Sequence, residues 1–268
     1  MTPILKWAGG KTQLLNYLIG YMPICFHKYY EPFCGGAALL LCFGPSRAHI
    51  NDINEQLINL YRQIKEDVDT VIAKVNELDS IPCTKTLYYY LREQYNSKIA
   101  SKTLDAECAA LMIWLNKHCY NGLYRVNLKG LFNVPYNNDD KNKKSIDENN
   151  LRNISAYLRY NDITITCQDF EEACKDAKKG DFVYFDSPYV PISDTSSFVE
   201  YTPTGFNAHE RLAKLYRELD SKGVQVMLSN NDVPIIRELY VGYPIISVPV
   251  RRHINRSTSR EVIIINYN

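Results

Sequence analysis

The sequence lacks any run of 18 or more apolar residues, the length that an α-helix needs to cross a bilayer. Its first stretch, Met1 to Lys6, also lacks the basic and apolar regions of a signal peptide. We therefore expect a cytoplasmic protein with no membrane partner. Hydrophobic residues make up 46% of the 268 positions, enough for one large domain or for a core with a smaller insertion.

Paired cysteine motifs and a strong net charge are absent as well. The eight cysteines include no Cys-x-x-Cys pair, and most lie within apolar segments, which favours reduced, packed thiols over disulfides or zinc ligands. We expect no bound metal. The formal net charge is only +1, so a nucleic-acid partner would have to be held by local basic patches and not by the overall field.

A phosphate-binding loop is incomplete near the N-terminus. The Gly-Lys-Thr at 10–12 resembles the end of such a loop, but Leu5 stands where its first glycine belongs, and too few residues precede it to form a strand. The nucleoside-triphosphate reading is therefore disfavoured. What remains is a glycine turn that opens an amphipathic helix and is flanked by Trp7, Lys6 and Lys11.

The stretch 182–189 is the feature around which the rest of the chain is organised. An apolar strand at Phe182 to Phe185 is followed at once by Asp186-Ser187-Pro188-Tyr189. In open α/β sheets, ligands bind beyond the carboxyl ends of the strands. An acid, a carbonyl and an aromatic ring placed there can meet a flat substrate that carries an amino group. Taken alone, the same residues fit an ordinary Asp/Ser/Pro turn equally well.

Two further strand ends favour a nucleoside cofactor. A short strand before Pro32 breaks into Gly35-Gly36 and a small-residue helix, which is the form of a first β-α turn where the backbone can approach a cofactor. The next strand ends at Asp52, where an acidic side chain can accept hydrogen bonds from both ribose hydroxyls. The glycine turn alone is weak evidence, and the pair is stronger.

The segment 56–145 interrupts the β-α alternation. Its apolar residues recur with helical spacing and no strand pattern stands out, so we expect an inserted helical domain there. It ends in the stretch 117–135, where Asn-Gly and Lys-Gly turns with alternating aromatics predict a β-hairpin. Arg125 and Asn127 on that hairpin can read base edges, although a plain surface hairpin fits as well.

Beyond the insert the alternation resumes, and the pattern predicts an α/β fold: a Rossmann-like, mixed, seven-stranded sheet with helices on both faces, formed by residues 1–55 and 146–268. Besides the strands before Gly35, before Asp52 and at 182–185, we expect strands at 163–166, 224–228, 245–248 and 262–265. The last two flank four arginines, Arg251, Arg252, Arg256 and Arg260. These can contact phosphates, or they can simply face solvent.

With these segments in order, the chain resembles the Dam-type (alpha-group, D12 class) DNA adenine-N6 methyltransferases, which use S-adenosylmethionine. The resemblance spans nearly the full length. The matching motifs are Lys6-Trp7-Ala8-Gly9-Gly10-Lys11, Glu31-Pro32-Phe33-x-Gly35, Asp52, Tyr120-Asn121-Gly122-Leu123-x-Arg125-x-Asn127, Phe132-Asn133-Val134-Pro135, Asp186-x-Pro188-Tyr189 and Ser229-Asn230. Together, in this order, they are highly specific.

The resemblance implies a role for each motif. Methyl would pass from S-adenosylmethionine to N6 of an adenine flipped out of duplex DNA, leaving S-adenosylhomocysteine. The insert at 56–145 would be a target-recognition domain that carries the β-hairpin. The residues implied around the cofactor are Trp7, Lys11, Phe33, Gly35, Asp52, Asp169 and Asp186; those implied on DNA are Lys6, Tyr120, Asn121, Leu123, Arg125, Asn127, Pro135, Arg251, Arg252 and Arg256; the catalytic set is Asp186, Ser187, Pro188 and Tyr189.

The chain departs from the family at one catalytic position. The family tetrapeptide is Asp-Pro-Pro-Tyr, whereas Ser187 stands second here. Adenine N6 is a poor nucleophile because its lone pair is delocalised. The Asp186 carboxylate and the Ser187 carbonyl would accept its hydrogens and localise that pair, while Tyr189 would stack on the base. Serine supplies the carbonyl but lacks the fixed φ of proline.

The resemblance also suggests the target GATC, with the adenine methylated. We expect a monomer that acts on double-stranded DNA at the nucleoid of a bacterial or phage-infected cell, alone or beside a restriction nuclease. Two other functions remain open. One is an amino methyltransferase that acts on RNA or on a protein glutamine, and the other is a DNA-binding module that Ser187 has disabled.

Overall fold

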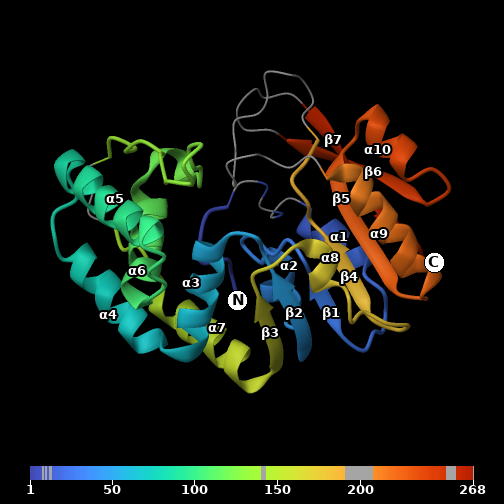
Figure 1. Cartoon of the computed structure of the whole chain (residues 1–268), viewed down its shortest axis with the longest axis horizontal. Helices are drawn as coiled ribbons and strands as arrows, with labels where there is room; N and C mark the ends of the chain where they lie inside the picture. The colour runs from blue at the N-terminus through green and yellow to red at the C-terminus, as the bar shows by residue number, and fades with distance from the viewer. Residues whose placement is uncertain are drawn as a thin grey trace. The chain divides into compact units, whose positions relative to one another are not determined.

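The computed structural model describes residues 1–7, 9, 11, 14–139, 143–190, 208–251 and 258–267. The chain divides into two compact units. The helical unit comprises Met1–Gly10 and Asn54–Cys167, and the sheet unit comprises Lys11–Ile53 with the described residues of 168–198 and 206–268. Figure 1 labels the helices and strands of both.

The strands form one mixed sheet in the order β3-β2-β1-β4-β5-β7-β6. Their bounds are β1 Tyr29–Glu31, β2 Arg47–Asn51, β3 Asp162–Thr166, β4 Phe182–Phe185, β5 Gln225–Asn231, β6 Ile245–Arg251 and β7 Thr258–Ile265. β1 is parallel to β2 and β4, β4 is parallel to β5, and β7 is antiparallel to β5 and β6. The prediction of a mixed, seven-stranded α/β sheet is confirmed, since each predicted strand overlaps an observed one.

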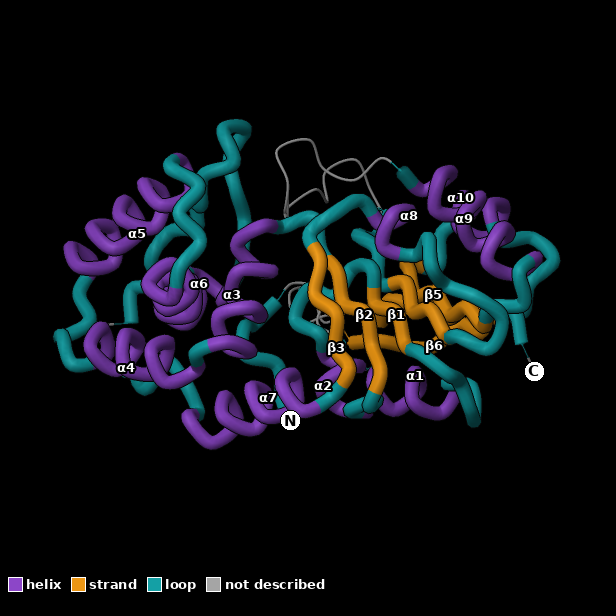
Figure 2. Tube along the Cα trace, turned by 60° about the horizontal axis from the view of Figure 1, so that its bottom comes forward, coloured by secondary structure: helices purple, strands orange, loops and turns teal. Residues whose placement is uncertain are grey.

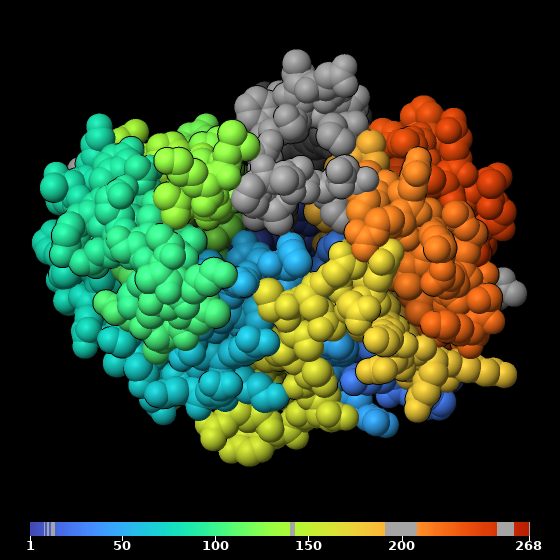
Figure 3. All heavy atoms as spheres, viewed as in Figure 1, coloured from blue at the N-terminus to red at the C-terminus, as the bar shows by residue number. Residues whose placement is uncertain are grey.

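Helices cover both faces of the sheet unit (Figure 2). α1 (Leu15–Tyr21) and α2 (Ala38–Phe43) lie on one face; α8 (Phe170–Ala173), α9 (His209–Ser221) and α10 (Pro234–Leu239) lie on the other. α9 runs in front of β5 in Figure 1, and its side chains form the surface there (Figure 3). The short helices α8 and α10 were not among the predicted elements.

Strand alternation decides which face each side chain enters. Val183 and Phe185 of β4 belong to the buried cluster that includes Leu212 and Tyr216 of α9. Phe182 lies on the opposite face, where its ring centroid is 5.5 Å from that of Tyr29. The same alternation carries the residue after the strand, Asp186, to the face of α1 and α2.

The helical unit consists of α3 (Glu55–Glu66), α4 (Val68–Asp79), α5 (Lys85–Ala100), α6 (Ala106–His118) and α7 (Glu148–Tyr160), with β3 after α7. Each of these helices starts after a side chain that accepts hydrogen bonds from its first turn: Asn54, Asp67, Thr84, Asp105 and Asp147. Such caps satisfy backbone donors that the helix itself leaves unpaired. α6 packs against α3, α4 and α5, and its residues from Cys108 to Asn116 are all buried.

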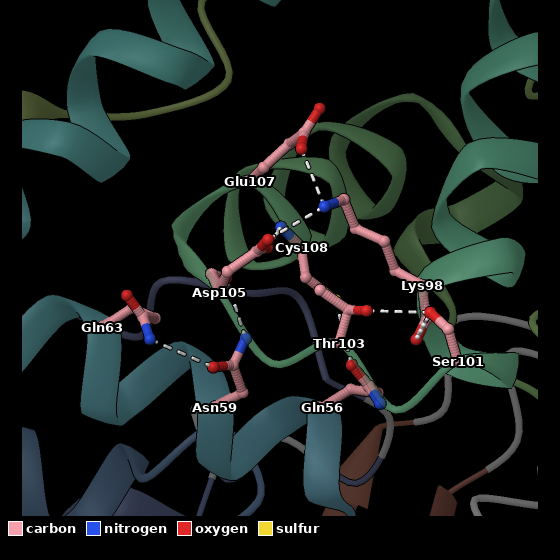
Figure 4. A network of polar contacts seen from close by, with 9 residues as sticks. All are labelled: Gln56, Asn59, Gln63, Lys98, Ser101, Thr103, Asp105, Glu107 and Cys108. Carbon is pink, nitrogen blue, oxygen red and sulfur yellow. Dashed lines mark hydrogen bonds and ion pairs between the residues drawn. The ribbon is translucent and has the colours of Figure 1, made fainter.

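A polar network holds the start of α6 in place (Figure 4). Lys98 at the end of α5 lies 2.9 Å from the Asp105 carboxylate and 2.7 Å from that of Glu107. Asn59 of α3 donates to the Asp105 carbonyl at 3.1 Å, and the Cys108 thiol donates to Gln56 at 3.0 Å. α3, α5 and α6 are therefore joined by side-chain bonds as well as by their apolar core.

The predicted hairpin is a loop with only sparse β pairing. Among the described residues, the 119–136 loop contains a 3-10 turn at Tyr120–Gly122 and two isolated antiparallel bridges, Cys119 with Tyr136 and Val126 with Phe132. The two arms of the loop also exchange backbone hydrogen bonds, from Tyr120 to Pro135 at 2.8 Å, from Asn127 to Leu131 at 2.9 Å and from Asn133 to Arg125 at 3.1 Å. Side chains of α5 bond the outgoing arm as well. Asn96 exchanges two hydrogen bonds with the Phe132 backbone, at 2.8 and 3.1 Å, and the Tyr88 hydroxyl donates to the Val134 carbonyl at 2.9 Å.

Candidate active site

Asp186 lies at the carboxyl end of β4, where the sequence pattern predicted a polar site. Its carboxylate is 2.6 Å from the Lys11 ammonium and accepts a hydrogen bond from the Ser229 hydroxyl at 3.2 Å. Ser229 comes from the neighbouring strand β5 and also shares a hydrogen bond of 2.9 Å with the Tyr184 hydroxyl. β4 and β5 thus deliver three polar side chains to the same face of the sheet.

Burial and charge act in opposite directions on this carboxyl group. Desolvation raises the pKa of Asp186 above its ordinary value, while the Lys11 ammonium and the hydrogen bond from Ser229 favour the ionised form. Lys11 is itself only 5% exposed. Because a buried cation of this kind needs a counter-charge, the pair is held together as an ammonium and a carboxylate.

Tyr189 completes the cluster from the other side of the tetrapeptide. The Lys11 ammonium lies 4.3 Å from the centroid of its ring, and its hydroxyl donates to Glu261 at 2.8 Å. Lys11 therefore touches both the acid and the aromatic face that the sequence assigned to catalysis. This site therefore stabilises a positively polarised amino group that lies over an aromatic ring and against a carboxylate.

Residues of β5 hold the chain at Val190, just after the tyrosine of the tetrapeptide. Asn230 accepts a hydrogen bond from the Val190 amide at 3.1 Å, and Asn231 donates to the Val190 carbonyl at 2.7 Å. Ser187 is 1% exposed, and its hydroxyl has no hydrogen-bond partner among the described residues. The Ser187 side chain therefore makes no hydrogen bond that the described part of the chain reveals.

Glu31 is a buried acid beneath the site that sequence reasoning assigned no role. It ends β1, is 2% exposed and accepts a hydrogen bond from the Tyr29 hydroxyl at 3.0 Å. Burial raises the pKa of Glu31 to about 8, with a further upward effect from the Asp186 charge. Its place in the Glu-Pro-Phe motif was the available signal, but the sequence could not show that the carboxyl group is buried.

Three of the residues expected around the cofactor, Phe33, Gly35 and Asp52, lie just beyond the carboxyl ends of β1 and β2. Asp52 follows β2 and accepts a hydrogen bond from the Gly35 amide at 3.0 Å. Asn51 beside it is 1% exposed and donates to the carbonyls of Pro32 and Gln168, at 3.0 and 2.9 Å. Asn51 thus ties the glycine turn to the residue that precedes Asp169. Sequence reasoning missed this link, because only the fold brings the three segments together.

Phe33 and Asp169 both lie near the start of α8. The Phe33 ring centroid is 5.2 Å from that of Phe170. Asp169 caps α8 by accepting from the Glu171 amide and lies 3.0 Å from Arg211, with a side chain that is 42% exposed. Asp169 is therefore occupied by a helix start and a surface ion pair in this structure.

The residues present fit a nucleoside cofactor. Two partly exposed glycines, Gly35 and Gly36, form the turn after β1, and Gly35 adopts a left-handed φ of 45°. A side chain on either would stand between the backbone and a ligand. Asp52 supplies the acceptor that ribose hydroxyls require, and the Phe33 ring supplies an aromatic surface.

In the helical unit, the expected DNA contacts share the outer side of the 119–136 loop. Residues alternate along it: Tyr124, Val126, Phe132 and Val134 are buried, whereas Leu123, Arg125, Asn127 and Asn133 are partly exposed and Tyr120, Asn121 and Pro135 are exposed. Arg125 donates through Nε to Asn133 at 2.8 Å. The Asn127 side chain accepts from the amides of Lys129 and Leu131, so it shapes the tip of the loop.

Five other residues with expected roles lie outside this loop. Lys6 and Trp7 belong to the helical unit, where Lys6 is exposed and the Trp7 ring stacks on Tyr124 at 5.1 Å between centroids. Arg251 is the last residue of β6, and its side chain is not described. Arg252 and Arg256 lie outside the described residues.

Within the described ranges, no group of three or more His, Cys, Asp or Glu side chains is arranged to hold a metal ion. In the same ranges, none of the helices combines the length and the apolar character that spanning a membrane requires.

Comparison with known proteins points to one family. Residues 7–254 match the family model described as D12 class N6 adenine-specific DNA methyltransferase. The chain is 42% identical to a type II methyltransferase of Lactococcus lactis subsp. cremoris, over 100% of this chain and 96% of that protein. It is 41% identical to a type II methyltransferase of Methanocaldococcus jannaschii, over 99% of each chain. It is 33% identical to the DNA adenine methylase of Escherichia coli, over 96% of this chain and 91% of that protein.

Proposed function

Because the chain belongs to the D12 class of N6 adenine-specific DNA methyltransferases, we propose that it transfers methyl from S-adenosylmethionine to an adenine flipped out of duplex DNA, within GATC. The observation that carries the site assignment is Lys11, whose ammonium lies against Asp186 and over the Tyr189 ring. The exocyclic amino group of a stacked adenine would need the same two neighbours.

The chain's own residues supply acceptors and a stacking surface. S-adenosylmethionine supplies an electrophilic methyl group, and its C–S bond breaks as the new N–C bond forms. The Asp186 carboxylate and the Ser187 carbonyl accept the two N6 hydrogens, so the nitrogen lone pair is localised toward the methyl carbon. One N6 proton then leaves through Asp186. Tyr189 holds the ring, with its hydroxyl fixed by Glu261.

Base entry requires Lys11 to give up part of its contact with Asp186. The adenine amino group replaces the ammonium at the carboxylate, as one donor exchanges for another. Unstacking and unpairing the base cost a few kcal/mol, which stacking on Tyr189 partly offsets. Burial raises the pKa of Asp186, and the Lys11 ammonium opposes that rise by favouring the carboxylate form, which accepts N6 hydrogens.

We assign cofactor binding and catalysis to residues 1–55 and 146–268, and target recognition to 56–145. The cofactor assignment is supported by Asp52 against the glycine turn and by the link that Asn51 makes between Pro32 and Gln168. The recognition assignment is supported by the outer residues of the 119–136 loop. We further propose that the protein acts as a monomer on cytoplasmic DNA.

The GATC proposal rests on the family motif at 120–135. The guanidinium of Arg125 has two terminal NH2 groups that can donate to guanine O6 and N7, while Asn133 holds its Nε. Leu123 and Pro135 lie on the same side of the loop and can pack on thymine methyl groups. Lys6 is the candidate for a second guanine.

The test is methyl transfer by the purified protein to duplexes with and without GATC, to RNA and to a glutamine-containing protein, using radiolabelled S-adenosylmethionine. We expect label on N6 of adenine in the GATC duplex alone, and none with Asp186→Ala. Label on RNA or protein would replace the proposal with another amino methyltransferase. DNA binding without any transfer would indicate a disabled DNA-binding module.

A further inference from the structure

Asn116 is a buried amide that holds the N-terminal segment against the 119–136 loop. It lies in α6 and is 4% exposed. Its Oδ1 accepts from the Lys6 amide at 2.9 Å, and its Nδ2 donates to the Lys6 carbonyl and the Gly122 carbonyl, both at 3.0 Å. One side chain therefore satisfies both backbone groups of Lys6 and one carbonyl of the loop.

The contact between Lys6 and Gly122 is closer than any other residue at 122 would permit. A Cβ added to Gly122 would lie 2.5 Å from Cδ and 2.8 Å from Cβ of Lys6. Gly122 has φ of +64°, and Asn121 before it also adopts a left-handed conformation, with φ of 55°. The stem of Lys6 thus packs directly on a tight turn, whose shape depends on glycine.

We propose that Asn116 is a positioning residue for target recognition: it fixes the distance and direction from Lys6 to Leu123 and Arg125 on the loop. This inference rests on the function proposed above, in which both elements read DNA. Asn116 is too deeply buried to contact DNA itself, so it acts through the backbone that it holds. Lys6 and the loop would then approach the groove as one rigid reader.

Asn96 provides a matched control within the same unit. It is also an asparagine that exchanges two hydrogen bonds with a backbone, in this case that of Phe132 on the outgoing half of the loop. None of the hydrogen bonds described for it reaches Lys6. Loss of Asn96 leaves the amide and carbonyl of Phe132 without these partners, whereas loss of Asn116 leaves both backbone groups of Lys6 and the Gly122 carbonyl without theirs. Only loss of Asn116 therefore releases Lys6.

The first measurement is amide hydrogen exchange of the free protein. Asn116→Ala should accelerate exchange of the Lys6 amide and leave that of Phe132 unchanged, and Asn96→Ala should do the reverse. Unchanged exchange at Lys6 in Asn116→Ala would overturn the proposal, whatever the enzyme does to DNA.

The second measurement is kcat/KM on a duplex that contains the methylated target sequence, found by mapping methylated adenines, and on duplexes with one base pair of that target changed. Asn116→Ala and Lys6→Ala should each lower discrimination by about tenfold at the same base pair, and the double variant should lose no more than either alone. An equal loss at every base pair, or an additive loss in the double variant, would overturn the proposal. If the wild type methylates no DNA, the proposed function fails, and the exchange result still decides the role of Asn116.

Gly122→Ala keeps the experiment decisive if Asn116→Ala does not fold. The added methyl group displaces the Lys6 stem but leaves the Asn116 side chain intact. It should reproduce the loss of discrimination at the Lys6 base pair, with cofactor affinity unchanged. Wild-type discrimination in folded Gly122→Ala would contradict the requirement for a fixed Lys6.

Discussion

The backbone is held in place differently at the catalytic end of the sheet unit and in the 119–136 loop of the helical unit. At the sheet, backbone ladders between β4 and β5 fix the chain, and the side chains of Asp186 and Ser229 remain available for the site. In the loop, β pairing is limited to two isolated bridges and a few backbone hydrogen bonds across it, and side chains such as Asn96 and Asn116 also hold the backbone. Substitutions should therefore alter chemistry in the first region and geometry in the second.

The helix starts show a related contrast. All five longer helices of the helical unit begin at a capping Asn, Asp or Thr side chain. In the described sheet unit, α8 alone has such a cap, whereas α1, α2, α9 and α10 have none. Helices that pack on a sheet gain their stability from that packing, whereas the helices of the helical unit rely more on local signals.

The largest effect should come from the acid that β4 delivers. Asp186→Ala removes the acceptor for N6 and should lower single-turnover methylation on the order of 10³-fold. Asp186→Asn is the matched variant, because it preserves shape while removing the charge that Lys11 pairs with. Cofactor titration and thermal unfolding would show that both variants are folded. Methylation near the wild-type rate in either would remove Asp186 from catalysis.

Substitution of Asp52 should disturb cofactor binding at the sheet most directly. Asp52→Ala should weaken S-adenosylmethionine binding by about 1.5–3 kcal/mol, the range for a hydrogen bond to a charged group. Since Asp52 also accepts from the Gly35 amide, Asp52→Asn is the control that keeps an acceptor for the turn. Calorimetry measures both affinities, and wild-type affinity in folded Asp52→Ala would place the ribose elsewhere.

The buried carboxyl group of Glu31, in the sheet unit, leads us to predict a pH-dependent free energy of unfolding. Its raised pKa of about 8 means that the folded chain keeps the proton, whereas the unfolded chain loses it near the ordinary value of 4.5. This contribution to stability is complete below pH 4.5 and is lost as pH rises toward 8. From pH 5.5 to 7, wild type should lose about 2 kcal/mol of unfolding free energy that Glu31→Gln does not lose. Urea unfolding tests this, and equal pH slopes would contradict it.

The recognition loop should respond in specificity and not in rate on the correct site. Arg125→Ala should relax discrimination at one guanine by about tenfold, within the 1–3 kcal/mol of a bidentate contact. Arg256→Ala, if that arginine touches only phosphate, should weaken all DNA about equally and lower the salt slope by about 1. Sequencing-based mapping of methylated adenines from a methylation-free host reads the first effect, and salt titration of binding reads the second. Methylation centred on another motif would exclude GATC but leave the adenine chemistry intact.

The smallest effect should come from restoring the family tetrapeptide. Ser187→Pro should keep activity or raise it slightly. Methyl transfer requires only the backbone carbonyl of residue 187, and the Ser187 hydroxyl has no partner among the described residues. Single-turnover rates decide this. A folded, cofactor-bound but inactive Ser187→Pro would mean that the hydroxyl itself takes part.

Local pattern determined the sheet strands and their polar ends. The strand ends before Gly35, Asp52 and Asp186 were marked by apolar patterns that stop at a glycine turn or an acidic residue. A buried strand that ends at a polar site must change from apolar to polar residues within a few positions. The order of motifs also identified the family. The hairpin shows the limit of such patterns: the inner and outer residues of 119–136 alternate as expected, yet its arms pair only in places, and α5 side chains bond the backbone of the outgoing arm.

Only the tertiary structure decided which distant groups meet. Lys11 reaches Asp186, Asn51 joins Pro32 to Gln168, and Asn116 joins Lys6 to Gly122. The buried state of Glu31, and with it the raised pKa, also follows from packing. Such contacts leave no periodic trace in the chain, because one polar side chain suffices to satisfy backbone groups from two remote segments once the core has brought them together.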